Sequence, residues 1–208
     1  QFSIFPPVIK NLMIINGLVF LAMAVPTTGH LLTVLFALWP FGAEGYTYGA
    51  ARLDTLGFMP WQLVTYSFLH GGLGHLFFNM FALWMFGMEL ENTWGSYRFA
   101  LFYFICVVGA GVTHLVATIG GVPVPTVGAS GGVFGVLLAF GMLFPDRSIF
   151  LFPFPFPIKA RIYVIGYGLV SLLSGMSNVA DGIAHFAHLG GMVFGYFLIR
   201  FWKRTNQI

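Results

Sequence analysis

Charged side chains are too scarce in this sequence to cover a folded surface that faces water. Only 7% of the 208 residues are Asp, Glu, Lys or Arg, whereas 58% are hydrophobic, and a soluble globular domain has about 25% charged residues. The net charge of +3 comes from nine Lys and Arg residues spread thinly along the chain, so it does not indicate a nucleic-acid partner. These features argue against a soluble enzyme, a disordered chain and a nucleic-acid binder, and they predict a multi-pass protein of the lipid bilayer.

The apolar residues form continuous runs that predict membrane-crossing helices, each of which needs about 20 residues. A transmembrane β-barrel would instead show alternating segments of about ten residues. We therefore predict an all-α bundle of six transmembrane helices, which forms a single membrane domain over residues 1–208. Pro26 is expected to end the first helix, and residues 27–73 are expected to form an outer loop embedded in the membrane interface. The predicted helices cover about 8–25, 75–88, 99–119, 128–144, 158–173 and 183–201.

The basic residues predict the orientation of these helices, because cytoplasmic loops carry an excess of Lys and Arg. With six crossings and a cytoplasmic N-terminus, only Arg52 falls on the outer side. Five or seven crossings would scatter the basic residues over both sides. We therefore predict that both termini are cytoplasmic. The eight residues expected on the inner side are Lys10, Arg98, Arg147, Lys159, Arg161, Arg200, Lys203 and Arg204.

The second, fourth and sixth predicted helices all begin on the outer side, with polar residues that are costly and usually functional inside a membrane. His75 and Asn79 are four residues apart and therefore share one face of the second helix. Ser130 lies at the start of the fourth helix, and His188 lies at the start of the sixth. Helix N-termini also offer unpaired N–H groups and a positive dipole end. These helix starts predict one shared site, suited to a negatively charged transition state.

The residue types at these helix starts are those of a serine hydrolase. A serine hydroxyl is a poor nucleophile until a base removes its proton, and histidine is the usual base. His75, the Asn79 amide and the backbone N–H of Ser130 are candidate donors to an oxyanion. Taken singly, however, Ser130 is also explained as a small packing residue, and His75 or Asn79 as a helix cap or an interhelical hydrogen bond.

Two glycine patterns bear on whether the serine and the histidine meet. Residues 131–135 and 191–195 have the form Gly-x-x-x-Gly, which is usually only a contact between helices. Here such a contact would bring the fourth and sixth helices together, and with them Ser130 and His188. Asp181 lies seven residues before His188 and is not expected to orient its ring. The sequence therefore predicts a Ser–His dyad.

Three blocks of the sequence resemble the motifs of the rhomboid intramembrane serine proteases, within residues 61–196. Residues 128–131, Gly-Ala-Ser-Gly, resemble the GxSG nucleophile motif, and residues 75–79, His-Leu-Phe-Phe-Asn, resemble the HxxxN motif. Residues 187–195 contain Ala-His-Leu-Gly-Gly and a later Gly, and resemble AHxxGxxxG. Each motif alone is weak, whereas all three in order on the expected helices are specific. One departure is Trp61-Gln62, where many members have Trp-Arg.

The resemblance implies a role for each matching residue. Ser130 would be the nucleophile and His188 the general base, while His75, Asn79 and the Ser130 N–H would hold the oxyanion. It also implies that Glu91 has a structural role and that residues 174–184 form a mobile cap over the site. The implied supporting residues are Gly128, Gly131, Phe134 (beside the His188 ring) and Gly191.

The sequence thus predicts an intramembrane serine endopeptidase that cuts transmembrane or juxtamembrane segments of membrane proteins. Its expected partners are such substrates and the lipid bilayer, without nucleic acid, and no oligomeric state is predicted. We expect no cofactor and no metal, since the sequence lacks H-E-x-x-H. We expect an integral location in a bacterial plasma membrane. The alternatives are a catalytically silent rhomboid-like protein that binds transmembrane segments, or a small transporter.

Overall fold

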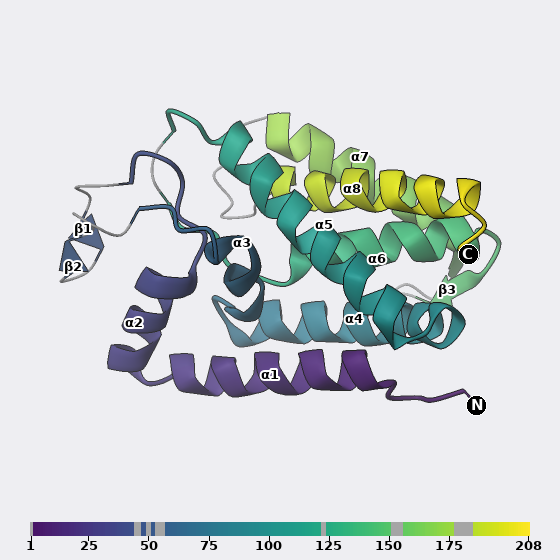
Figure 1. Ribbon diagram of the computed structural model, residues 1–208, viewed down its shortest axis with the longest axis horizontal. Coiled ribbons are helices and arrows are strands. Elements are labelled where there is room, and N and C mark those ends of the chain that lie inside the picture. The colour runs from purple at the N-terminus through teal and green to yellow at the C-terminus, as the bar shows by residue number, and fades with distance from the viewer. Residues whose placement is uncertain are drawn as a thin grey trace.

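Six long helices run back and forth along one axis and make up most of the protein (Figure 1). The computed structural model describes residues 2–43, 47–48, 51–52, 57–121, 124–150, 156–176 and 185–208. Both termini lie at one end of the bundle, and the short elements between α1 and α4 lie at the other end (Figure 1). The long helices are α1 (Pro7–Met23), α4 (Leu73–Trp94), α5 (Ser96–Ala117), α6 (Ser130–Leu143), α7 (Ala160–Met176) and α8 (His185–Arg204).

The segment expected as an outer loop over 27–73 contains more regular structure than predicted. Pro26 does not simply end the first helix. It begins a second helix, because proline is well suited to the first position of a helix, where no N–H partner is needed. The elements in this segment are α2 (Pro26–Phe36), α3 (Gln62–Thr65), the 3-10 helix η1 (Tyr66–Phe68), and a small hairpin of β1 (Thr47–Tyr48) and β2 (Ala51–Arg52).

The Trp61-Gln62 pair holds this outer segment together. The Trp61 indole N–H donates to the Leu35 carbonyl at 2.9 Å. The buried Gln62 side-chain oxygen accepts hydrogen bonds from the backbone N–H groups of Trp39 and Met59, both at 3.2 Å. The uncharged side chain of Gln62 therefore holds this segment from a buried position with its oxygen satisfied.

Helix α4 extends to Trp94, well past the predicted end at residue 88, because its acidic residue Glu91 is satisfied inside the protein. The Glu91 carboxylate accepts hydrogen bonds from the backbone N–H groups of Val8 and Ile9, both at 2.9 Å, and from the Ser96 hydroxyl at 2.6 Å. The first turn of α1 has N–H groups without helical partners and the positive end of the helix dipole. This one buried side chain therefore joins α1, α4 and α5.

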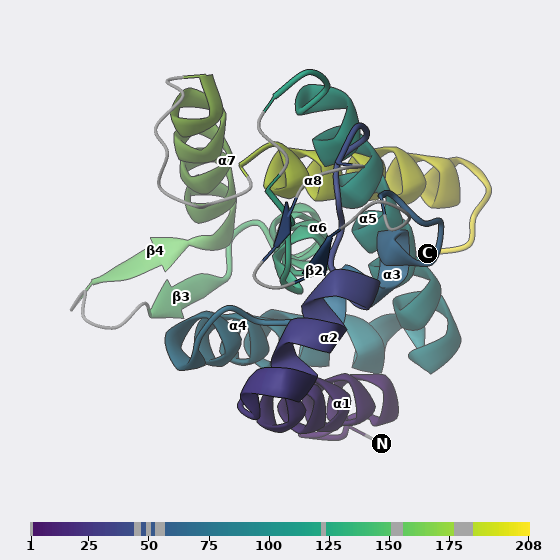
Figure 2. The ribbon, with the colours of Figure 1, turned by 90° about the vertical axis from the view of Figure 1, so that its left-hand side faces the viewer.

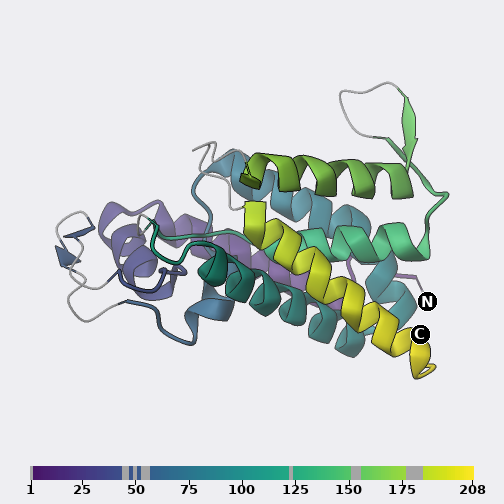
Figure 3. The same cartoon turned by 90° about the horizontal axis from the view of Figure 1, so that it is seen from above.

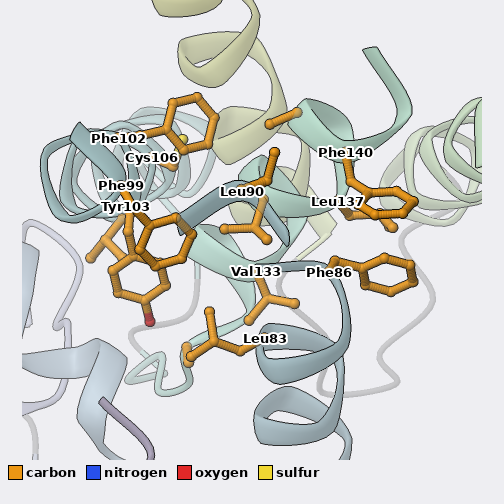
Figure 4. Packing of buried hydrophobic residues seen from close by; sticks show 14 of the residues in the cluster. Leu83, Phe86, Leu90, Phe99, Phe102, Tyr103, Cys106, Val133, Leu137 and Phe140 are labelled. Carbon is orange, nitrogen blue, oxygen red and sulfur yellow. The ribbon is translucent and has the colours of Figure 1, made fainter. Parts of the chain in front are cut away.

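The core lies where α4, α5 and α6 meet, with α8 packed across α5 and α6. Figure 4 shows side chains from α4, such as Leu83 and Phe86, together with Phe102 and Cys106 of α5 and Phe140 of α6. The Phe86 and Phe140 rings meet edge to face, with centroids 5.1 Å apart. Helix α6 is buried along most of its length, and its first residue, Ser130, is half-buried.

The outside of the bundle carries many large apolar side chains that nothing else in the structure covers. Such extended apolar surface is typical of a membrane-facing protein. By length and composition alone, however, only α4 and α5 among the described helices are long and apolar enough to cross a membrane, rather than the six predicted. Pro7–Met23, Ser130–Leu143 and Ala160–Val170 are apolar but shorter. On α7, the exposed side chains include Ile162, Ile165, Leu169, Val170 and Leu173.

The eight basic residues expected on the inner side belong to segments at the end of the bundle where the termini lie (Figure 1). They sit near the start of α1, α5 and α7, just after α6, or in the last turns of α8. Arg52 belongs to β2 at the opposite end. The segments that carry these eight residues and the strand that carries Arg52 therefore lie at opposite ends of the bundle.

Candidate active site

The structure brings Ser130 and His188 into direct contact at the start of α6 and α8. The Ser130 Oγ and the His188 Nε2 are 2.9 Å apart, a hydrogen-bond distance. Ser130 is the first residue of α6 and His188 lies in the first turn of α8. The predicted helix begins at about residue 128, whereas α6 begins two residues later, at Ser130 itself, where backbone N–H groups have no helical partner.

Two glycines set the spacing between α6 and α8 at this point. A Cβ atom at Gly191 would collide with the backbone carbonyl of Gly131. A Cβ atom at Gly131 would collide with the Cβ of Ala110 on α5 and would lie 3.1 Å from the Tyr66 hydroxyl. The helices thus pack backbone to backbone beside the serine and the histidine, and only glycine fits at both positions.

An aromatic stack fixes one face of the His188 ring. The Phe134 ring, one turn after Ser130 on α6, lies parallel to it with centroids 4.0 Å apart and planes at 12°. Tyr167 of α7 packs against Phe134, with its ring centroid 5.0 Å from that of Phe134. The imidazole is therefore held between its contact with Ser130 and an apolar wall that extends to α7.

His75 and Asn79 lie on the first turns of α4, on the other side of the Ser130 segment. Gly128 has φ +128, a conformation that favours glycine, and a Cβ atom there would lie 2.7 Å from the His75 ring and 3.8 Å from the Ser130 Oγ. Gly128 therefore lies between these two side chains. The buried Asn79 amide donates one hydrogen bond to the His75 carbonyl at 2.8 Å, and a side-chain amide has a second N–H to offer.

The segment before Ser130 is tied to the outer segment by backbone hydrogen bonds. Leu38 and Thr126 exchange two such bonds, of 3.0 and 2.9 Å, and the Gly128 N–H donates to the Tyr66 carbonyl at 2.9 Å. The Thr126 hydroxyl also contacts the His114 ring at 2.6 Å. These hydrogen bonds therefore fix the position of the segment that leads into Ser130.

His70, whose sequence context indicates only an interfacial or structural residue, contacts the segment just before Ser130. Its side chain is buried, and its Nε2 accepts a long hydrogen bond of 3.5 Å from the N–H of Ala129, the residue before Ser130. Its ring also meets the His75 ring edge to face, with centroids 4.9 Å apart. Burial, and then the neighbouring His75, lower the pKa of His70 from 6.5 to about 4. A neutral ring is what the Ala129 contact requires, and no sequence motif signals a contact between residues so far apart.

Other expectations concern residues around this site. The predicted cap at 174–184 falls largely outside the described residues, as does Asp181. The His185 ring lies 6.1 Å from the His188 ring, centroid to centroid, and does not replace it at Ser130. Within the part of the chain that the structure describes, no three His, Cys, Asp or Glu side chains are grouped so that they could hold a metal ion.

Comparison with known proteins identifies the family of this chain. Residues 57–204 match the rhomboid domain family. The chain is 35% identical over 139 residues to "Rhomboid protease GluP" of Bacillus subtilis (strain 168). It is 33% identical over 138 residues to "RHOMBOID-like protein 4" of Arabidopsis thaliana, and 33% identical over 140 residues to "RHOMBOID-like protein 1" of the same plant.

Each of these matches covers 66% of this chain, but only 25% of the Bacillus protein and 33% of each plant protein. The chain therefore spans only a quarter to a third of the length of these relatives, and the family match over residues 57–204 runs from α3 to α8. The matching region contains Ser130, His188 and the helices that carry them. On this match and this fold, the chain belongs to the rhomboid family.

Proposed function

We propose that this protein is an intramembrane serine endopeptidase that uses Ser130 and His188 to cut transmembrane or juxtamembrane segments of other membrane proteins. The observation that carries the proposal is the 2.9 Å contact between the Ser130 Oγ and the His188 Nε2. The named protease among the relatives supports the same class of reaction. We further propose six membrane crossings, with both termini on the cytoplasmic side.

The proposed reaction starts with proton transfer between these two side chains. His188 accepts the hydroxyl proton of Ser130, and the oxygen attacks the scissile carbonyl. His188 then protonates the leaving amine, which gives an acyl-enzyme that water hydrolyses with His188 again acting as the base. The Phe134 ring keeps the imidazole in the plane required for both steps, since the rings are stacked at 4.0 Å.

The oxyanion of the tetrahedral intermediate would form beside Gly128. The Ser130 N–H is available there because it is the first N–H of α6. The His75 ring faces the same glycine, and Asn79 has a second amide hydrogen to donate. Removing one such donor typically costs on the order of 100-fold in kcat. A Cβ at Gly128 would collide with the His75 ring, so glycine is required at this point of the proposed oxyanion site.

The substrate class follows from where this chemistry is located. The site sits at one end of a bundle whose outer surface is apolar, so a membrane-embedded segment can approach it. A helical substrate must unwind locally, because its carbonyl groups are hydrogen-bonded within the helix. We therefore propose substrates with small or helix-breaking residues near the cut. The relatives come from a bacterium and a plant, so they fit a bacterial plasma membrane and an organelle equally.

Cleavage of a single-span model substrate by purified protein in vesicles tests this proposal. Wild type is expected to release two fragments, whereas Ser130→Ala and His188→Ala should lose at least 1,000-fold in rate, as for other serine hydrolases. Ser67→Ala is a matched control, because Ser67 is a buried serine whose hydroxyl donates to the Val64 carbonyl, outside the proposed site. Folded wild type that binds the substrate without cutting it would instead support a silent binding protein.

A further inference from the structure

A β-hairpin between α6 and α7 is not used by the proposed chemistry. Its strands are β3 (Ser148–Phe150) and β4 (Pro157–Lys159), paired antiparallel with Ser148 opposite Lys159 and Phe150 opposite Pro157. The two strands project sideways from the bundle instead of continuing the helix axes, as the end-on view of Figure 2 and the view from above in Figure 3 both show. The hairpin therefore extends across the direction of the helices at their inner end.

The two faces of this hairpin differ sharply. Ile149 is buried and belongs to the core cluster together with Ala160 and Val164 of the adjoining α7 segment. The opposite face carries Phe150, 69% exposed, and Lys159, with a side chain 51% exposed. Phe156, just before β4, is 73% exposed. One face thus attaches the hairpin to the bundle, and the other presents the Phe150 ring and the Lys159 cation to the surroundings. Phe156 adds a second exposed ring just outside the paired strands.

The charges beside these rings are mainly positive. Arg147 pairs with Glu89 of α4 at 3.1 Å. Lys159 and Arg161 share the single carboxylate of Asp146, at 3.3 and 3.2 Å. After this pairing about one positive charge remains. Exposed phenylalanines next to lysine and arginine are the combination that lies at the boundary between acyl chains and anionic headgroups.

We propose that the exposed face of this hairpin is a lipid-binding surface that lies in the inner headgroup region of the bilayer and prefers anionic phospholipids. The occupant follows from position and charge. The hairpin lies at the end of the bundle that collects the basic residues, and it continues directly into α7, whose exposed side chains are apolar. A lipid surface that covers α7 meets the hairpin at its base. This inference rests on the proposed membrane location.

Lipid binding by the hairpin would also position α7, since backbone hydrogen bonds join the first residues of α7 to the residues just before β3. The Ala160 N–H donates to the Arg147 carbonyl at 2.9 Å, and the Arg161 N–H donates to the Pro145 carbonyl at 3.2 Å. A hairpin held in the headgroup layer therefore fixes the inner end of α7 at a set depth. The same helix carries Tyr167, which packs on Phe134 beside His188.

Site-directed fluorescence in vesicles tests the depth of the hairpin. Single cysteines for a bimane label are placed in a Cys106→Ala background at Phe150, at Leu169 of α7 and at Gln207. Leu169 lies about 14 Å along α7 from its first residue, by the helical rise, and is 55% exposed. Gln207 is exposed at the C-terminus. Lipids with nitroxide groups at shallow or deep acyl positions then act as quenchers.

The label at Phe150 should be quenched most strongly by the shallow nitroxide, and the label at Leu169 by the deep one. The label at Gln207 should be quenched by aqueous iodide. A Phe150 label that behaves like the Gln207 label, while the Leu169 label is quenched by lipid, would overturn the hairpin proposal alone. A Leu169 label that no lipid nitroxide quenches would overturn the membrane location itself.

The lipid preference is tested with the same Phe150 label. A nitroxide on an anionic phospholipid is compared with the same nitroxide on a zwitterionic one, at equal mole fraction. One net cation near an anionic surface enriches the anionic lipid about fivefold, so the anionic quencher should be correspondingly stronger. The Lys159→Gln/Arg161→Gln variant should abolish this excess, and the control Arg200→Gln/Lys203→Gln, on α8, should retain it. Equal quenching by both lipids in the wild type would refute the preference.

Discussion

The close packing of α6 against α8 makes a strong prediction for Gly191→Ala. The new methyl group would collide with the backbone carbonyl of Gly131, and backbone cannot rotate away as a side chain can. An ordinary contact of about 3.5 Å requires the two helices to separate by on the order of 1 Å. Overpacking of this kind typically costs about 1–3 kcal/mol of stability, and we expect the upper part of that range because both obstacles are main chain.

The same separation acts on the site. Ser130 and Gly131 are neighbours on α6, and His188 lies one turn before Gly191 on α8. If the Ser130 Oγ to His188 Nε2 distance increases from 2.9 Å by about 1 Å, the hydrogen bond is lost. A misplacement of 1 Å can cost about 100-fold in rate. Gly191→Ala should therefore lower kcat/KM about 100-fold.

Gly166→Ala is the matched control for this substitution. Gly166 lies on α7, and a Cβ atom there meets nothing within 4 Å. The control should keep wild-type cleavage and gain up to about 1 kcal/mol from helix propensity. Cleavage of a single-span substrate and thermal unfolding of the same samples measure both quantities. Gly191→Ala protein that unfolds at the wild-type temperature and cuts at the wild-type rate would refute the packing argument.

Three further substitutions test other contacts. Glu91→Gln should lower the free energy of unfolding by about 3 kcal/mol, because the amide nitrogen of glutamine would face buried donors whose hydrogen bonds the carboxylate accepts. The control Glu89→Gln, which removes a half-exposed ion pair, should cost at most about 1 kcal/mol in the same thermal melts. Gly128→Ala should reduce kcat at least tenfold through contact with His75, while Gly120→Ala, which has φ +74 but open space, should leave cleavage unchanged; equal losses would contradict this reading. His70→Ala should reduce kcat about fivefold at constant KM, because the Ala129 N–H loses one acceptor. Since the pKa of His70 is lowered from 6.5 to about 4, the stability from its neutral form is complete above pH 6.5 and is lost as the pH falls toward 4. His70→Ala should therefore be less sensitive to pH in that window, and a parallel pH profile would contradict the contact.

The residues that meet at the site were predictable because their helices start at one end of the bundle. Alternating crossings place the starts of α4, α6 and α8 together, and glycine spacing indicated that α6 and α8 approach closely. The contact between Ser130 and His188 then follows from two local patterns. The sequence did not indicate that Ser130 itself begins α6. That depends on Gly128, whose φ of +128 cannot belong to a helix.

Features that depend on contacts between distant segments could not be predicted in this way. The role of His70 exists only because the fold brings it to Ala129, 59 residues later. The continuation of α4 to Trp94 depends on Glu91 being satisfied by the first turn of α1. Pro26 was ambiguous for a local reason, since proline both ends one helix and begins another. The hairpin of β3 and β4 likewise depends on pairing between two separated segments, which no local pattern indicates.

Mapping the site of modification by a fluorophosphonate is the most direct test of the central claim. The reagent phosphonylates an activated serine, so peptide mass analysis of labelled wild type should place the adduct on Ser130. His188→Ala should remain folded and show almost no adduct, because the hydroxyl has lost its base. Ser67→Ala should label like the wild type. Folded wild-type protein that gains no adduct, or gains it on another serine with equal yield in His188→Ala, would contradict the assignment of Ser130 and His188 as the reacting pair.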